Sequence, residues 1–196
     1  GMTECAPIIT YDDWSVEKLY SCGKTVPNME IMIASPDPRN VPGEIRVKGA
    51  NVFLGYFKNE EATKEVFTED GWFRTGDMGV IDQDGCLFIK GRSKCMILGP
   101  SGQNIYPEEV EVVINSQPYV VDSLVVEDNG GLTALIYPDF PQGLKEGMNQ
   151  KAFATFVENM LPELNKELPN YARLKKIVVM TEDFERTPKK SIKRYL

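Results

Sequence analysis

The sequence predicts an α+β protein: a β-rich, barrel-like subdomain followed by a small α/β domain with helices on a small sheet. In the first half, short apolar or alternating runs stand between turn clusters, as antiparallel strands do. In the second half, two apolar runs flank a DNGG turn at residues 128–131 and are accompanied by segments of helical spacing. The length of 196 residues with 42% hydrophobic content allows one large domain or two small ones with a real core.

The first half is expected to consist mainly of strands. They are predicted at residues 29–34, 43–49 and 86–90. Residues 82–85 have the composition of a hairpin turn that leads into the last of them. Residues 60–67 have helical spacing, and Asn59 is suited to cap that helix.

The second half mixes helices with strands. Helices are predicted at residues 107–116 and 150–168, and strands at 121–127, 132–137 and 176–180. Pro107 suits the first position of its helix, whereas Pro162 should bend or divide the longer one. The result is a compact layer of helices on a small sheet.

Composition excludes several classes of function. The net charge of −7 argues against general nucleic-acid binding, and the absence of histidine removes Ser-His-Asp and Cys-His catalysis. The four cysteines show no CxxC spacing, so free thiols in a reducing compartment are expected. With no apolar stretch long enough for a membrane span and no leader sequence, we expect a cytoplasmic protein.

The charge is distributed unevenly along the chain. Residues 173–196 hold eight basic and three acidic side chains, so their net charge is +5, whereas the net charge of the remaining residues is −12. A basic tail on an acidic body either solvates a surface or meets a polyphosphate ligand.

The centre of the chain, residues 91–111, reads GRSKCMILGPSGQNIYPEEVE. A short strand is expected at residues 94–98, and Gly99 and Gly102 permit positive φ or the close approach of a ligand or second backbone. A β-hairpin followed by a helix would use similar residues, so local chemistry leaves a structural and a ligand-binding interpretation open.

Wider motifs add a resemblance. GRSK at residues 91–94 and GQNIYPEEVE at 102–111 resemble the hinge and following loop of the adenylate-forming superfamily, which includes acyl-CoA synthetases, luciferases and adenylation domains. GEIRVKG at 43–49 and GWFRTGDM at 71–78 are similar to further motifs of that superfamily. The segment NIYPEEVE at residues 104–111 is most similar to the corresponding segment of long-chain fatty-acyl-CoA ligases.

The resemblance implies a domain division and a reaction. Residues 1–90 would be the β-rich end of the N-terminal adenylation domain, and residues 91–196 the mobile C-terminal domain. A fatty acid would react with ATP to give acyl-adenylate, and coenzyme A would then form the thioester. Because the family's phosphate loop is missing here, the chain alone should not catalyse this. The alternatives are acyl transfer to a carrier-protein thiol and a non-catalytic partner-binding module.

The resemblance also implies nucleotide contacts. The motif at residues 1–4 would place Thr3 on an ATP phosphate and Glu4 on Mg²⁺, which hydroxyl and hard carboxylate oxygens suit. Asp77 would accept hydrogen bonds from both ribose hydroxyls, and Arg92 would help hold the nucleotide.

Two further features follow from the same likeness. Lys94 would be the hinge about which the C-terminal domain turns between adenylating and thioester-forming poses. Gly99 and Gly102 would line the thiol tunnel in the second pose. Cys95 is a departure, because many relatives have aspartate there.

The tail departs from the family pattern. Its relatives end in Arg-Thr-Pro-x-Gly-Lys-Ile-x-Arg, whose lysine bridges the α-phosphate and the attacking carboxylate. Here residues 186–194 read RTPKKSIKR, and an ungapped match puts Ser191 at the lysine position. Our hypothesis is that Lys190 supplies the charge after a one-residue shift of the loop. The alternative is that the basic residues, Lys189 among them, only solvate the tail.

Overall fold

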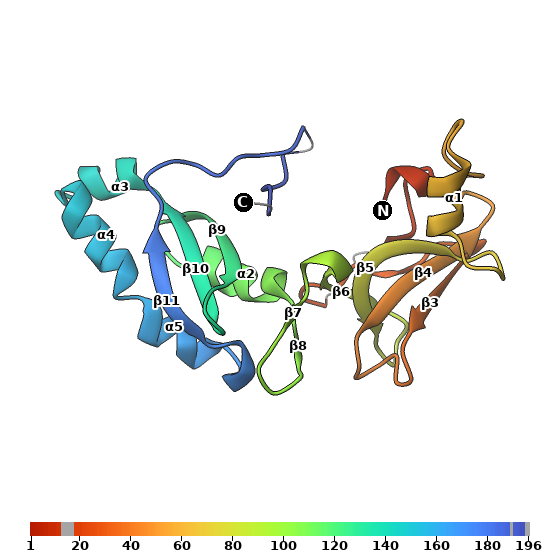
Figure 1. Cartoon of the computed structure of the whole chain (residues 1–196), viewed down its shortest axis with the longest axis horizontal. Helices are drawn as coiled ribbons and strands as arrows, with labels where there is room; N and C mark the ends of the chain where they lie inside the picture. The colour runs from red at the N-terminus through yellow and green to blue at the C-terminus, as the bar shows by residue number, and fades with distance from the viewer. Residues whose placement is uncertain (13–17, 189, 195–196) are drawn as a thin grey trace. The chain divides into compact units, whose positions relative to one another are not determined.

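The computed structural model describes residues 1–12, 18–188 and 190–194 (Figure 1). The chain divides into two compact units, Gly1–Lys94 and Cys95–Leu196, here called unit 1 and unit 2. Strands and helices are both present and the strands form several separate sheets, which confirms the α+β class.

Unit 1 is built on a four-stranded antiparallel sheet of order β3-β4-β5-β6. The strands are β3 (Met29–Ala34), β4 (Gly43–Gly49), β5 (Phe73–Ile81) and β6 (Leu87–Arg92). The first two match the predicted ranges residue for residue, and β6 runs two residues beyond its predicted end. Because this order is linear, the described sheet is open, and the barrel-like part of the prediction does not extend to a closed barrel.

The core of unit 1 lies on the face of the sheet that carries Ile45, Val47 and Phe73, each at most 3% exposed. The Phe73 ring contacts those of Phe53 and Phe67, which flank the helix α1 (Glu60–Val66) on its two sides. Asn59 caps this helix as predicted, accepting a hydrogen bond from the Ala62 N–H at 3.1 Å. The smaller elements of unit 1 are η1 (Thr3–Cys5), β1 (Thr10–Tyr11) and β2 (Lys24–Thr25).

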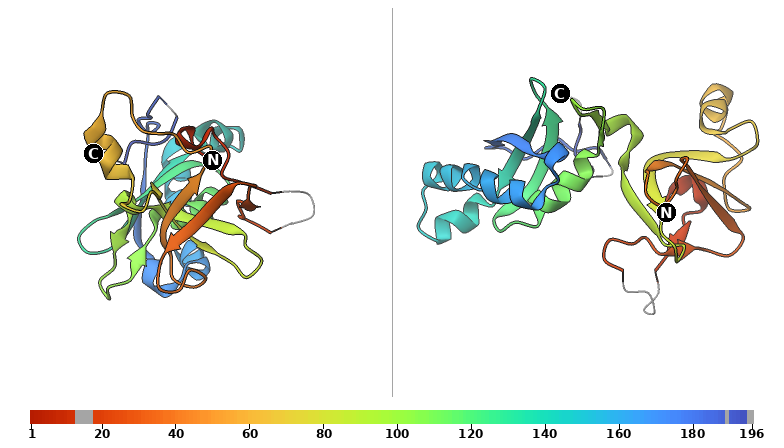
Figure 2. Two further views of the ribbon diagram at one scale, coloured as in Figure 1. Left: turned by 90° about the vertical axis from the view of Figure 1, so that its right-hand side faces the viewer. Right: turned by 90° about the horizontal axis from the view of Figure 1, so that it is seen from below.

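Unit 2 has a three-stranded sheet of order β11-β10-β9, whose strands are β9 (Val120–Glu127), β10 (Leu132–Pro138) and β11 (Leu174–Val179). β9 and β10 form an antiparallel hairpin, whereas β10 and β11 are parallel. Helices α2 (Pro107–Asn115), α4 (Gln150–Glu158) and α5 (Leu161–Glu167) lie against this sheet (Figure 2). Ala134 and Ile136 of β10 share one buried cluster with side chains from all three helices.

The long helix predicted at residues 150–168 is divided, as Pro162 led us to expect. α4 ends at Glu158, and Pro162 lies in the first turn of α5, where a missing N–H costs no hydrogen bond. α3 (Phe140–Lys145) was not predicted, because Pro141 and Gly143 are poor helix formers. The helix is started locally, because Asp139 caps it by accepting the Gln142 N–H at 3.0 Å and Pro141 lies in its first turn. Glycine is required at position 143 for packing, since a Cβ there would lie 2.7 Å from the Phe153 ring.

The central stretch differs from the prediction at its start. Residues Ser93–Cys95 form a 3₁₀ turn, η2, and the strand predicted from residue 94 begins only at Ile97. β7 (Ile97–Leu98) then pairs with β8 (Asn104–Ile105), and α2 follows directly. The local interpretation of a hairpin followed by a helix is therefore correct as a description of the backbone.

Within the part of the chain described, no helix has the length and apolar character needed to cross a membrane. All four cysteines lie in that part and none forms a disulfide; Cys5 and Cys86 are buried and the other two half-buried.

Candidate functional site

Asp77 and Arg92 lie opposite each other on neighbouring strands of unit 1. The Arg92 guanidinium donates a hydrogen bond from Nη1 to Asp77 Oδ1 at 2.5 Å. The pairing of β5 and β6 continues for one more pair, Met78 with Gly91, and its register then shifts at Lys90 of β6. Two residues singled out from separate motifs thus form one charged pair at an irregular point of the sheet.

The backbone beneath this pair is fixed by Thr75. Its hydroxyl donates to the carbonyl of Ile45 at 2.7 Å and accepts from the Asp77 N–H at 3.1 Å. Thr75 is 7% exposed, whereas the Arg92 and Asp77 side chains are 56% and 25% exposed. A buried hydroxyl therefore holds in place a carboxylate and a guanidinium that solvent and ligands can reach.

Thr3 and Glu4 lie together in η1 of unit 1. Glu4 accepts a hydrogen bond from the Tyr56 hydroxyl at 3.3 Å, and its backbone carbonyl accepts the Phe53 N–H at 2.8 Å. Burial is the main cause that raises the pKa of Tyr56, with the Glu4 charge adding to it. The Tyr56 hydroxyl thus remains a hydrogen-bond donor to Glu4 at neutral pH.

The acidic side chains of the described residues do not form a preformed metal site. Among the described residues, no group of three or more His, Cys, Asp or Glu side chains is close enough together to hold a metal ion. A single carboxylate such as Glu4 fits Mg²⁺, which typically takes one or two carboxylates and completes its shell with water and substrate phosphates.

The predicted hinge residue, Lys94, is the last residue of unit 1. It lies inside η2, which directly follows β6, so only Ser93 separates it from Arg92 in the sequence. The backbone passes from one compact unit to the other at this position.

Gly99 and Gly102 close the β7–β8 hairpin of unit 2. The Gly102 N–H donates to the Gly99 carbonyl at 2.9 Å, and the Gly99 N–H donates to the Gln103 carbonyl at 2.8 Å. Gly102 has φ of +79°, and a Cβ at Gly99 would lie 3.1 Å from the Ile105 side chain. Glycine is therefore favoured at the two positions for different reasons: Gly102 has a left-handed backbone, and Gly99 packs closely against Ile105.

Lys190 and Ser191 lie in a hairpin of the tail. The Lys190 N–H donates to the Thr187 carbonyl and the Thr187 N–H to the Ser191 carbonyl, both at 2.8 Å. An antiparallel bridge joins Arg186 to Ile192. Lys189 falls outside the described residues.

The backbone at Lys190 bears on the predicted shift of the loop. Lys190 has φ of +63°, a left-handed conformation that glycine adopts most easily. In an ungapped match to the family motif, Lys190 stands where the motif has glycine and Ser191 where it has lysine. A left-handed backbone at Lys190 is consistent with the ungapped match, in which the family motif has glycine at this position.

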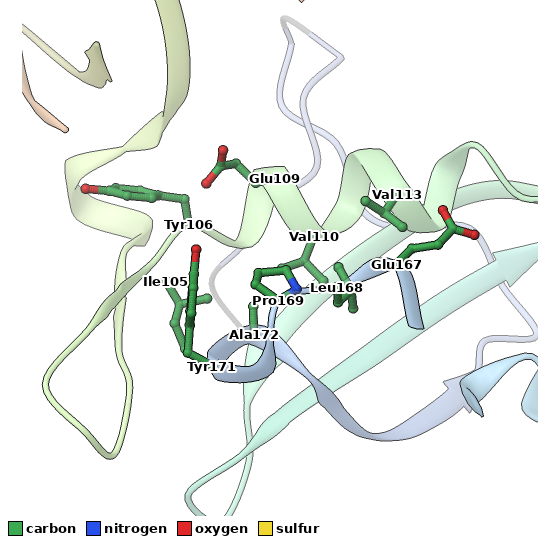
Figure 3. A pocket seen from close by; sticks show the side chains of 10 residues that line it. All are labelled: Ile105, Tyr106, Glu109, Val110, Val113, Glu167, Leu168, Pro169, Tyr171 and Ala172. Atoms are coloured by element: carbon green, nitrogen blue, oxygen red, sulfur yellow. The ribbon is translucent and has the colours of Figure 1, made fainter. Parts of the chain in front are cut away.

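Two cavities of unit 2 were not predicted. One, of about 460 Å³, is lined by the β7–β8 hairpin together with Lys175 and Arg173. The other, of about 220 Å³, lies between α2 and the 3₁₀ turn η3 (Asn170–Ala172), with Val110 and Leu168 in its apolar wall (Figure 3). Neither gives a local sequence signal, because their walls come from segments far apart in the chain.

Two segments of the chain match known family descriptions. Residues 1–57 match "AMP-binding enzyme" and residues 96–196 match "AMP-binding enzyme C-terminal domain". The stretch between them contains Asp77, Arg92 and Lys94.

Curated relatives extend the match over the whole chain. A long-chain-fatty-acid–CoA ligase of Escherichia coli O6:H1 is 32% identical over 206 residues, covering 100% of this chain and 34% of the relative. A 2-succinylbenzoate–CoA ligase of Bacillus licheniformis is 45% identical over 128 residues, covering 63% and 26%. The chain therefore spans about a third of the length of such relatives.

A solved structure agrees with both findings. The O-succinylbenzoate coenzyme A synthetase of Bacillus subtilis, in complex with ATP and a magnesium ion, is 32% identical with a TM-score of 0.80. The match covers 98% of this chain and 39% of the solved one.

Proposed function

Because this chain belongs to the AMP-binding enzyme family, we propose that it is the C-terminal portion of an acid–thiol ligase that activates a carboxylic acid with ATP. The first half-reaction joins a carboxylate oxygen to the α-phosphorus of ATP and releases pyrophosphate. In the second, the sulfur of coenzyme A bonds to the acyl carbon, its proton is lost and AMP leaves. The relatives reported above are all coenzyme A ligases or synthetases, which favours coenzyme A over a carrier-protein thiol.

The observation that carries this proposal is the Asp77–Arg92 pair. An ionised carboxylate has about four acceptor sites, so Asp77 can accept two ribose hydroxyls while it keeps the hydrogen bond from Arg92. The Arg92 guanidinium is more than half exposed, and its planar fork of donors matches the geometry of a phosphate. The pair therefore combines a ribose acceptor with a phosphate donor at one place on the sheet.

Thr3 and Glu4 are assigned to the phosphates and to Mg²⁺. The Thr3 hydroxyl would donate to a phosphate oxygen, and the Glu4 carboxylate, held by Tyr56, would be the protein ligand of the ion. Bound Mg²⁺ would neutralise charge on the phosphates.

Unit 2 is assigned the remaining roles. Lys190 would supply the cation between the α-phosphate and the substrate carboxylate, because its ammonium sits on a long flexible stem. Ser191 would occupy the neighbouring position as a hydroxyl donor. Lys94 would be the hinge between the two half-reactions, and the turn containing Gly99 and Gly102 would line the thiol tunnel.

A fatty acid is the proposed substrate. The support is the Escherichia coli fatty-acid ligase, whose similarity runs over the whole of this chain. None of the four cysteines forms a disulfide, which is consistent with the proposed cytoplasmic location.

The test is a panel of acids given to the natural protein that contains this chain. Hexadecanoate, 2-succinylbenzoate and 4-coumarate would each be offered with ATP, Mg²⁺ and coenzyme A, and pyrophosphate release and thioester would be measured. We expect hexadecanoate to be preferred, and preference for an aromatic acid would contradict the assignment to fatty acids. The 196-residue chain alone should show no pyrophosphate exchange, because it holds only part of the nucleotide.

A further inference from the structure

The tail hairpin is attached to unit 2 by an arginine on each of its two strands. Arg194 reaches α2, where Nη1 lies 2.8 Å from Glu111 Oε1 and Nη2 lies 2.5 Å from Glu111 Oε2. Its Nη2 is also 3.5 Å from Glu108 Oε1. Arg194 and Glu111 thus form a bidentate ion pair between two planar groups, which is the strongest geometry available to an arginine and a carboxylate.

Glu111 is placed to hold that arginine rigidly. It is only 7% exposed, and its Oε1 also accepts the Val125 N–H of β9 at 2.8 Å. A carboxylate buried to this extent is costly unless both oxygens have partners, which Arg194 and Val125 provide. Burial alone would lower the pKa of Arg194, but its hydrogen bonds to Glu111 and the two nearby carboxylate charges raise it. The arginine is therefore charged at any pH at which the protein is folded.

The second attachment lies on the other strand of the hairpin. Arg186 Nη2 is 2.8 Å from Asp122 Oδ2 on β9 and 2.9 Å from Asp183 Oδ1. Its Nη1 donates to the backbone carbonyl of Lys190 at 3.4 Å. One guanidinium thus connects β9 with the residue proposed to carry the catalytic charge.

The two attachments act on one small rigid piece. Arg186 is bridged to Ile192, two residues before Arg194, so the two arginines lie on opposite arms of the hairpin. Glu185 and Lys193 also connect the two arms of the hairpin. The Glu185 carbonyl accepts the Lys193 N–H, and the Glu185 carboxylate pairs with the Lys193 ammonium at 3.0 Å. The turn between Thr187 and Ser191 is then held from both sides.

We infer that Glu111 and Asp122 are positioning residues, which through Arg194 and Arg186 fix where the Lys190 turn lies on unit 2. This inference rests on the adenylating function proposed above. A transfer to phosphorus depends on charge placed accurately, and a displacement of about 1 Å can cost about 100-fold in rate. Neither carboxylate touches a substrate in this role.

The structural part is tested on the 196-residue chain by hydrogen exchange. The amides of Thr187, Lys190 and Lys193 are the bonded amides of the hairpin, and in Glu111→Gln they should exchange about tenfold faster or more. The matched control is Glu163→Gln, which removes an exposed ion pair with Lys166 in the same unit and should leave those amides unchanged. Unchanged tail amides in Glu111→Gln would overturn the inference.

The catalytic part is tested on the natural protein that contains the chain. Glu111→Gln should lower kcat for adenylation by about 100-fold with little change in KM for ATP, and spare thioester formation from supplied acyl-adenylate. If the tail amides lose protection while adenylation stays normal, the positioning role is wrong.

A charge swap separates this role from general destabilisation. Arg186→Asp alone should slow adenylation, and Arg186→Asp with Asp122→Arg should recover at least part of the rate; no recovery would count against the Asp122 attachment. These surface positions also give a test if Glu111→Gln fails to fold. If the unaltered protein adenylates no acid, the proposed function fails, while the exchange experiment still decides whether the carboxylates hold the tail.

Discussion

Asp77 Oδ1 and Arg92 Nη1 lie 2.5 Å apart because β5 and β6 place their two residues in register. The pair occupies the last paired position of β6, two residues before the chain passes from unit 1 to unit 2. The nucleotide contact assigned to Arg92 therefore lies two residues before the proposed hinge, Lys94, in the sequence, and the hydrogen bond from Arg92 connects Asp77 to the same place.

Asp77→Asn should weaken use of ATP without unfolding unit 1. The amide keeps the shape of the side chain but loses its charge and one acceptor, so kcat/KM for ATP should fall by about 100-fold, or about 3 kcal/mol. Initial rates of pyrophosphate release measure this. Glu30→Gln, an exposed change on β3 of the same sheet, is the control, and an equal loss in both variants would contradict the assignment.

Lys190→Ala should reduce adenylation by several orders of magnitude while leaving thioester formation from supplied acyl-adenylate almost unaffected. The reason is that only the first half-reaction needs a cation between phosphate and carboxylate. Separate assays of the two half-reactions distinguish these effects. Normal adenylation by Lys190→Ala would remove Lys190 from the site.

Lys190→Gly should stabilise the tail turn by about 1 kcal/mol, because a left-handed conformation is costly for a residue with a Cβ. Slower exchange of the bonded amides of the hairpin would show it. Combining Lys190→Gly with Ser191→Lys recreates the Gly-Lys order of the family motif and should restore adenylation. A double variant as inactive as Lys190→Gly would mean that position 191 does not face the phosphate.

Lys94→Pro should spare adenylation and block thioester formation. Proline fixes φ near −65° and restricts the residue before it, so η2 could no longer change conformation between the two half-reactions. Single-turnover assays of each half-reaction provide the measurement. Equal losses in both would show that Lys94 is not the hinge.

Acid should remove the contribution of the Lys18–Asp82 ion pair on unit 1. The hydrogen bond from Lys18 is the main cause that lowers the pKa of Asp82 from its ordinary value of 3.8. A carboxyl with a lowered pKa stabilises the fold above its unfolded-state pKa, and this is lost as pH falls through the folded value. Lys18→Met should thus lower Tm at pH 7 by no more than about 3 °C and by less at pH 2. A difference that grew on acidification would contradict this.

Local patterns were sufficient for much of the fold. Residues 29–34 and 43–49 are strands as predicted, and Asn59 and Pro162 act as their chemistry indicated. α3 was missed although Asp139 caps it and Pro141 lies in its first turn, because Gly143 inside it weakens the helical pattern.

The site shows the same limit. Asp77 and Arg92 could be chosen from motifs, but the contact between Glu111 and Arg194 was missed. Each of these residues ends a motif seen in the sequence, yet nothing in either motif indicates that two residues 83 positions apart meet. The left-handed backbone of Lys190 was also hidden, because lysine gives no signal for it.

The mixed sheet of unit 2 has a consequence for the order of folding. β9 and β10 are joined by a tight turn and can pair early, because closing a short loop costs little entropy. β11 pairs with β10 in parallel, so residues 139–173, with three helices, must first cross over the sheet. The tail follows β11 in the sequence, and its attachments to Glu111 and Asp122 close long loops, so its hairpin is expected to dock after β9 and β10 have paired. Pulsed hydrogen exchange during refolding should therefore find protection first in β9 and β10, then in β11, and last at Lys190.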